Sequence, residues 1–161
     1  RYYHQQMGLI HLVARDLPAA LVEFEQAIDP EENGAFKGDQ LFSLTASAFL
    51  HEVVGDPELA KERLAQADRA LNRARINGLD NPDIYYNESV IDVLHEDYEG
   101  AVEALQAADD RGRRQTWVLD IDGRHEPLHE MPASIELRQT IEQDIQQARA
   151  EIESLAVAML R

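Results

Sequence analysis

Apolar residues recur at helical intervals along most of the chain. In residues 2–15, Tyr3, Met7, Ile10 and Ala14 follow one another at spacings of three and four residues, which places them on one face of a helix. Comparable patterns predict further helices at 17–28, 38–54, 57–76, 83–95, 98–110 and 133–160. Because no alternating pattern typical of strands accompanies them, the sequence predicts an all-α fold.

The segments between these helices contain residues that begin or end a helix. Asp16 and Asp56 each precede a predicted helix and stand close to a proline, Pro18 or Pro57. An aspartate at this place accepts backbone N–H groups, and proline is tolerated in the first turn of a helix. The stretch 29–34 has no apolar period and holds both proline and glycine, so we expect a loop there.

Small residues recur in a frame that repeats after forty and then forty-one residues. In each copy the second small residue follows the first by twelve positions, and the third follows by seven more. The nine residues are Gly8, Ala20 and Ala27; Ala48, Ala60 and Ala67; Ser89, Ala101 and Ala108. Small side chains let two helix backbones approach closely where they cross. The frame therefore predicts three pairs of antiparallel helices.

This frame resembles the tetratricopeptide repeat, a helix–turn–helix unit of about 34 residues. The first copy matches best, in the run from Arg1 to Gly8, in Arg15-Asp16-Leu17-Pro18-Ala19-Ala20, and in Phe24, Ala27 and Pro30. The resemblance implies a right-handed α-solenoid in residues 1–114, with three repeats at about 1–34, 38–78 and 82–112. Because such arrays present extended concave binding surfaces, it also implies recognition rather than catalysis.

Residues 115–132 break the helical pattern with Gly123, Pro127 and Pro132, and we expect a short helix and an ordered loop there. The run from Asp120 to Pro132 is similar to the closing segment of the repeat domains of bacterial adenylate/guanylate cyclases and membrane-bound winged-helix transcription regulators. Gly123 replaces the proline that usually begins that motif. The resemblance implies a C-terminal sensory or partner-binding module of a larger bacterial regulator. We therefore expect an effector domain to precede Arg1 in a longer protein.

The last predicted helix carries a heptad pattern. Its apolar positions alternate spacings of four and three residues: Ile141, Ile145, Ala148, Ile152, Leu155 and Met159. This pattern is typical of a helix–helix seam. Two interpretations are open: the helix caps the last repeat, since a solenoid must cover its exposed end, or it joins two chains in a coiled coil. We expect a cap, because the seam is short for an independent coiled coil.

Composition narrows the class of partner. The chain has a formal net charge of −16 and a pI near 4.6, so it repels nucleic-acid phosphates and anionic membrane surfaces. A basic protein segment is the partner that this charge favours. No apolar run is long enough to cross a membrane. The absence of cysteine fits a cytoplasmic protein, and a periplasmic location stays open if the parent protein is a membrane-bound regulator.

One motif matches a catalytic signature. The run His125-Glu126-Pro127-Leu128-His129 has the spacing of a zinc-protease helix, in which both histidines lie on one face. Pro127 lies between the two histidines and disrupts such a helix. We therefore expect no metal site and no catalytic residue here, and nothing else in the sequence indicates a cofactor.

In a tetratricopeptide array the first helix of each pair lines the concave face. We expect the exposed positions of these helices to form a concave strip that binds a partner. The candidate residues are Tyr2, Gln5, Leu9 and Leu12; Phe42, Phe49 and Glu52; and Asp83, Tyr86 and Val90. Their apolar and aromatic side chains, with acid at Glu52 and Asp83, favour an apolar protein segment with basic flanks. The alternative function is structural assembly, in which two copies dimerise through the terminal helix or this strip.

Overall fold

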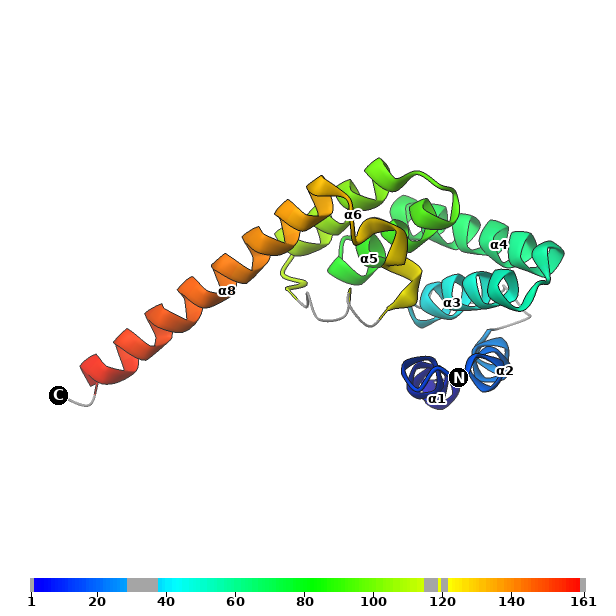
Figure 1. Cartoon of the computed structure of the whole chain (residues 1–161), viewed down its shortest axis with the longest axis horizontal. Coiled ribbons are helices and arrows are strands. Elements are labelled where there is room, and N and C mark those ends of the chain that lie inside the picture. Colours follow the sequence, from blue (N-terminus) through cyan, green and yellow to red (C-terminus); the bar gives the residue numbers. More distant parts are fainter. Residues whose placement is uncertain (1, 29–37, 115–118, 120–121, 160–161) are drawn as a thin grey trace.

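The computed structural model describes residues 2–28, 38–114, 119 and 122–159. All regular secondary structure in these residues is helical (Figure 1). The elements are α1 (Tyr2–Val13), α2 (Leu17–Ala27), α3 (Gly38–Val54), α4 (Pro57–Ile76), α5 (Pro82–Leu94), α6 (Tyr98–Asp110), the 3₁₀ helix η1 (Gly123–Leu128) and α8 (Pro132–Met159). The all-α fold is thus confirmed, and each predicted helix lies within two residues of its observed limits. The expected loop at 29–34 and the segment 115–118 lie outside the described residues.

The second helices of the pairs begin in the same way. Asp16, Asp56 and Asp97 each accept a hydrogen bond from the backbone N–H three residues later, over 3.3, 3.3 and 3.0 Å respectively. One position before each aspartate the backbone has a positive φ, at Arg15 (62°), Gly55 (88°) and Glu96 (62°). Glycine adopts this left-handed conformation readily, whereas other residues are strained in it. The three turns therefore share one backbone geometry although only one of them has glycine at this position.

The six helices pack as successive pairs. α1 packs on α2, α3 on α4 and α5 on α6, while α3 also contacts α1 and α5. All nine small residues of the frame are buried at these contacts. At Gly8 the approach is close, because an added Cβ would lie 2.8 Å from the ring of Phe24. The small residues therefore lie at the contacts where close packing of two helices requires small side chains.

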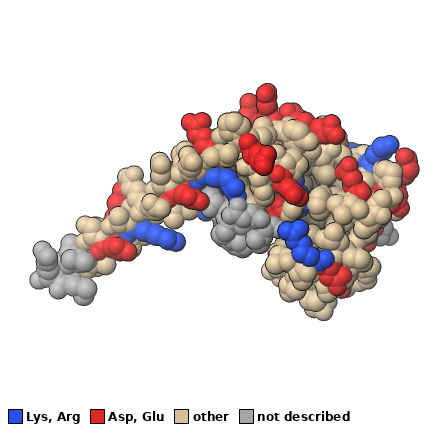
Figure 2. All heavy atoms as spheres, in the orientation of Figure 1, with Lys and Arg blue, Asp and Glu red and all other residues tan. Residues whose placement is uncertain are grey.

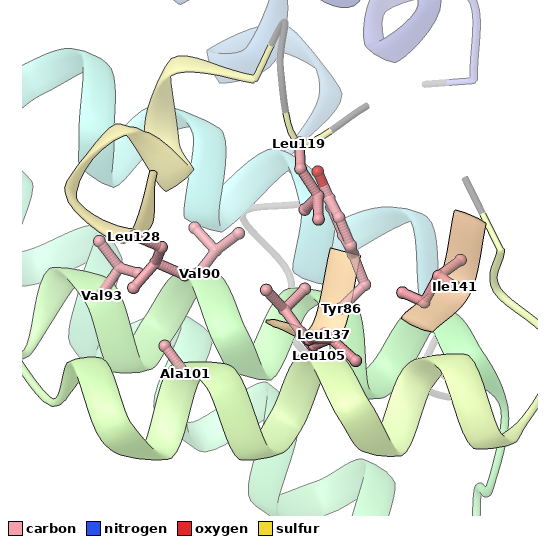
Figure 3. Packing of buried hydrophobic residues seen from close by; sticks show 9 residues of the cluster. All are labelled: Tyr86, Val90, Val93, Ala101, Leu105, Leu119, Leu128, Leu137 and Ile141. Carbon is pink, nitrogen blue, oxygen red and sulfur yellow. The ribbon is translucent and has the colours of Figure 1, made fainter. Parts of the chain in front are cut away.

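Three apolar clusters follow the pairs along the molecule. The first joins Leu12, Phe24 and Leu50, and the second joins α3, α4 and α5. The third contains residues from α5 and α6 together with the C-terminal part of the chain (Figure 3). In that cluster Leu128 of η1 packs with Val90 and Val93, as Leu137 of α8 does with Leu105.

A half-buried acidic side chain ties the first pair to the second. Glu25 of α2 accepts hydrogen bonds from Arg63 Nη2 at 2.6 Å and from Ser47 Oγ at 2.5 Å, and lies 3.3 Å from His51 Nε2. Burial would raise the pKa of Glu25, but the hydrogen bonds from Arg63 and Ser47 outweigh it and lower the pKa to about 2. Glu25 is therefore ionised and linked to both α3 and α4.

The long helix α8 has two different halves. Near its start it packs on α6, and Leu137 and Ile141 are buried in the third cluster. It then projects away from the other helices (Figure 1), and Ile152, Leu155 and Met159 are exposed by 66, 65 and 87%. The first half therefore covers the end of the last helix pair, as expected for a cap, whereas the second half does not. Among the described helices, none has the length and apolar character of a bilayer span.

Candidate functional site

The predicted concave strip is crossed by the chain's own C-terminal part. Residues 122–128, which we call the crossing segment, include η1, and η1 packs on α5. The guanidinium of Arg124 lies 4.5 Å from the centre of the Phe42 ring, and its Nη1 donates to Thr45 Oγ1 at 3.1 Å. The crossing segment thus contacts both α3 and α5, which come from two different helix pairs.

A buried ion pair anchors this segment. Arg124 is 1% exposed and donates to Asp122 through Nη2 at 2.6 Å and Nε at 2.8 Å. The hydroxyl of Tyr86 also donates to Asp122, at 2.6 Å. Burial would raise the pKa of Asp122, but the adjacent Arg124 guanidinium outweighs it and holds the pKa well below its usual range. Both charges are therefore present and matched, which limits the cost of removing them from water.

His125 is held in one protonation state by its neighbours. Ser89 Oγ donates to the Tyr86 carbonyl at 2.7 Å and lies 2.8 Å from His125 Nε2. Since the single hydroxyl proton of Ser89 is used, His125 Nε2 must donate the second bond. Burial lowers the pKa of His125 to about 4, so the ring is neutral near pH 7. Ser89 therefore has two roles, as the small residue of a helix crossing and as a partner of the crossing segment.

The two histidines of the zinc-protease spacing face different partners. Residues 123–128 form a 3₁₀ helix with Pro127 inside it, so the i, i+4 geometry of a catalytic α-helix is not formed. His125 bonds with Ser89, whereas His129 Nε2 donates to the carbonyl of Leu119 at 2.9 Å. No group of three His, Asp or Glu side chains that could hold a metal occurs among residues 2–28, 38–114, 119 and 122–159.

On either side of the crossing segment the strip has a pocket. The first, the Asp83 pocket, has a volume of about 340 Å³ and is lined by Gln5, Phe42, Asn81, Asp83, Ile84, Tyr86, Asn87 and Arg113. Its polar groups are engaged with one another: Arg113 pairs with Asp83 and lies 3.9 Å from the centre of the Tyr86 ring. Asn87 Nδ2 donates to the carbonyl of Asp83. This pocket has few free groups for a ligand.

The second, the Glu52 pocket, has a different character. It has a volume of about 380 Å³ and is lined by Phe49, Glu52, Val53, Val93, Leu94, Glu96, Tyr98, Gly123, Arg124, Glu126 and Pro127. Its apolar residues come from α3, α5 and the crossing segment, and three carboxylates stand among them. Arg124 is the one basic residue in this lining, and its charge is matched by Asp122. The pocket is therefore apolar with an unbalanced negative charge.

The structure divides the predicted site residues into three groups. Gln5, Phe42, Asp83 and Tyr86 line the Asp83 pocket, and Phe49 and Glu52 line the Glu52 pocket. Tyr2 and Leu9 are exposed on α1, while Leu12 and Val90 are buried in the core. The exposure expected from the repeat frame is wrong for Leu12, Tyr86 and Val90. Leu12 packs with Phe24, and the C-terminal part of the chain covers the other two.

Sequence reasoning missed the polar groups that hold the crossing segment. Thr45, Asp122 and Arg124 are buried, and Arg124 donates hydrogen bonds to both of the others, yet Thr45 is far from the other two in the sequence. One local signal exists: Thr45 is a small polar residue between the aromatic strip positions Phe42 and Phe49. A polar residue there indicates that a hydrogen-bonding group approaches the strip.

Comparisons with known proteins identify no relative of this chain. Neither the protein-family models, nor the curated proteins, nor the solved structures contain a match to this chain.

Proposed function

We propose that this chain is a tetratricopeptide-like module that binds a partner protein segment in the Glu52 pocket. The proposed architecture is a right-handed solenoid of three helix pairs. Burial of all nine frame residues and the repeated aspartate caps support it. The observation that carries the binding proposal is the Glu52 pocket itself, since side chains from two helix pairs and the crossing segment form one concave apolar surface.

The partner that fits this pocket is an apolar segment with lysine or arginine flanks. Phe49, Val53 and Val93 provide apolar contact, and Glu52, Glu96 and Glu126 provide negative charge. Lysine and arginine bury an apolar stem while their charged end stays near water, which matches an apolar floor with carboxylates around it. The carboxylates steer and orient the partner, and the apolar contacts supply most of the affinity.

The proposal includes no catalytic step and no cofactor. The buried titratable groups of the crossing segment are engaged inside the protein, with Asp122 on Arg124 and Tyr86, and His125 on Ser89. In the sequence, the resemblance of the run from Asp120 to Pro132 to bacterial cyclases and winged-helix regulators supports a role as a regulatory module of a larger signalling or transcription protein.

A peptide display library selected on the immobilised protein tests this function. We expect the enriched peptides to carry apolar residues flanked by Lys or Arg, and Phe49→Ala to weaken their binding at least tenfold. Glu52→Lys should weaken binding comparably. Glu103→Lys is the matched control, because it makes the same charge change at an exposed position of α6 outside both pockets.

Two results would overturn the proposal. One is a selection that enriches acidic peptides or enriches no peptide at all. The other is a selected peptide that binds Phe49→Ala as tightly as the parent protein. Melting curves of each variant show whether a loss of binding is a loss of fold.

A further inference from the structure

The outer half of α8 presents an apolar stripe to solvent. The α8 stripe consists of Ala148, Ile152, Leu155 and Met159, at heptad spacing. It continues the line of Ile141 and Ile145, which pack against the other helices, into the part of α8 that projects from them (Figure 1). In Figure 2, charged residues of both signs lie along the projecting helix with uncharged surface between them. A helix with this pattern is typical of one strand of a helix pair.

The side chains of two α8 stripes are complementary in size when the two helices run in opposite directions. If Ile152 faces Leu155 of the second copy, the same register places Ala148 opposite Met159 of the second copy. The smallest side chain of the stripe then meets the longest, and two branched side chains of similar volume meet between them. This alternation of small and large residues is what lets facing helices interdigitate.

The rest of the molecule excludes the parallel arrangement. At Leu137 and Ile141 the same face of α8 is covered by α5 and α6. In a parallel pair the second α8 would run along this face at that level, where those helices already lie. In an antiparallel pair Met159 of the second α8 lies opposite Ala148, and the globular part of the second copy lies beyond Met159 of the first. The two acidic globular parts, in chains of formal charge −16 each, are then held at opposite ends.

We infer that two copies of this chain associate through an antiparallel pairing of the α8 stripes. The start of α8 is already held by Leu137 and Ile141, so the helix does not have to nucleate when the second copy binds. The contact spans residues 148–159, which is short, so the dimer is reversible and dissociates on dilution. This inference is independent of the peptide site, because no residue of the stripe lines either pocket.

Sedimentation velocity of the full chain over a concentration series tests the association. We expect the sedimentation coefficient to rise with concentration, and Ile152→Glu/Leu155→Glu to raise the dimer dissociation constant at least tenfold. Gln143→Glu/Ala150→Glu adds the same two charges on the opposite face of α8, and should change the constant less than twofold. A parent chain that stays monomeric, or a control that loses the dimer equally, would overturn the inference.

Cysteine cross-linking tests the direction of pairing, because the chain has no cysteine of its own. Ala148→Cys and Met159→Cys are prepared separately, mixed and oxidised mildly. An antiparallel pair brings the two different cysteines together and keeps like cysteines about 16 Å apart along the axis, so the mixed disulfide should predominate. Disulfides only between like chains, or none above the level of Gln143→Cys, would contradict the arrangement.

Discussion

The first and third helix pairs follow one residue frame but differ in what covers them. Leu9 of α1 and Val90 of α5 occupy the same frame position, yet Leu9 is 38% exposed and Val90 is fully buried. Phe49, at this position in the second pair, is half-buried beside Gly123. Exposure at these predicted strip positions therefore falls from the first pair to the third, where the C-terminal part of the chain covers Val90. The frame determines how helices cross, and the C-terminal part determines which strip residues a partner can reach.

The same comparison separates two kinds of stabilisation. Around the first pair, Phe24 packs closely against Gly8, and no charge is fully buried in the described part of α1 and α2. Around the third pair, a buried ion pair and a buried histidine join α3, α5 and the crossing segment. The effects of substitutions on unfolding free energy should therefore differ in size and in pH dependence between these two regions.

The largest effect should come from Arg124→Leu. This change leaves the Asp122 carboxylate buried without its partner, which costs about 3–5 kcal/mol. Urea denaturation measures the loss of unfolding free energy. Asp122→Asn combined with Arg124→Leu should recover a substantial part of it, because no buried charge is then left unpaired. A loss below about 1 kcal/mol for Arg124→Leu would show that the crossing segment is not held by this pair.

A smaller effect should come from Gly8→Ala in the first pair. The added Cβ lies 2.8 Å from the Phe24 ring, and overpacking of this kind costs about 1–3 kcal/mol. The second and third pairs have leucine, Leu64 and Leu105, at the position of Phe24. Phe24→Leu should therefore destabilise the parent chain but cost less, or stabilise, in the Gly8→Ala background. If the two changes simply add in a double-mutant cycle, the close approach does not limit this crossing.

Helix limits and crossings could be predicted from the sequence because the signals for them are local. Asp16, two residues before Pro18, is a local signal for the start of a helix, and the small-residue frame depends on spacing within a pair. The crossing segment could not be predicted in this way. Arg124 and Thr45 form a hydrogen bond although 79 residues separate them in the sequence, and no periodic pattern predicts that contact. For the same reason the frame predicted Val90 to be exposed, since the residues that cover it lie outside the repeats.

The pH dependence of stability should also distinguish the third pair. The pKa of His125 falls from 6.5 to about 4 in the folded chain because the ring is buried. Between these values the unfolded chain binds a proton that the folded chain does not, so His125 stabilises fully above pH 6.5 and less as pH falls towards 4. His125→Gln should therefore flatten the stability curve over this range. Parallel curves for the variant and the parent would contradict a buried neutral histidine.

Asp92, on the same helix pair, has a pKa shift that changes stability with pH in the opposite direction. Burial, with the nearby Glu88, raises the pKa of Asp92 from 3.8 to about 6. The folded chain then binds a proton before the unfolded chain does, so this group opposes folding above pH 6 and ceases to do so as pH falls towards 3.8. Stability measured in the Asp92→Asn background therefore isolates the contribution of His125.

The smallest effect concerns the turns that all pairs share. Arg15 and Gly55 occupy equivalent positions with φ of 62° and 88°. Glycine adopts this conformation without strain, whereas other residues lose about 1 kcal/mol or more. Arg15→Gly should therefore raise the unfolding free energy by about 1 kcal/mol and Gly55→Ala should lower it by a similar amount. Thermal melts that shift in the same direction for both variants would show that the two turns are not equivalent.

Amide hydrogen exchange with and without a selected Lys-flanked peptide tests the central claim most directly. The peptide should slow exchange at the end of α3, around Phe49 and Val53, at the α5–α6 turn near Glu96, and in the crossing segment. Exchange in α1 and α2 should not change, although Tyr2 and Leu9 are exposed there. Protection confined to α1 and α2, or absent from the crossing segment, would contradict a binding site in the Glu52 pocket.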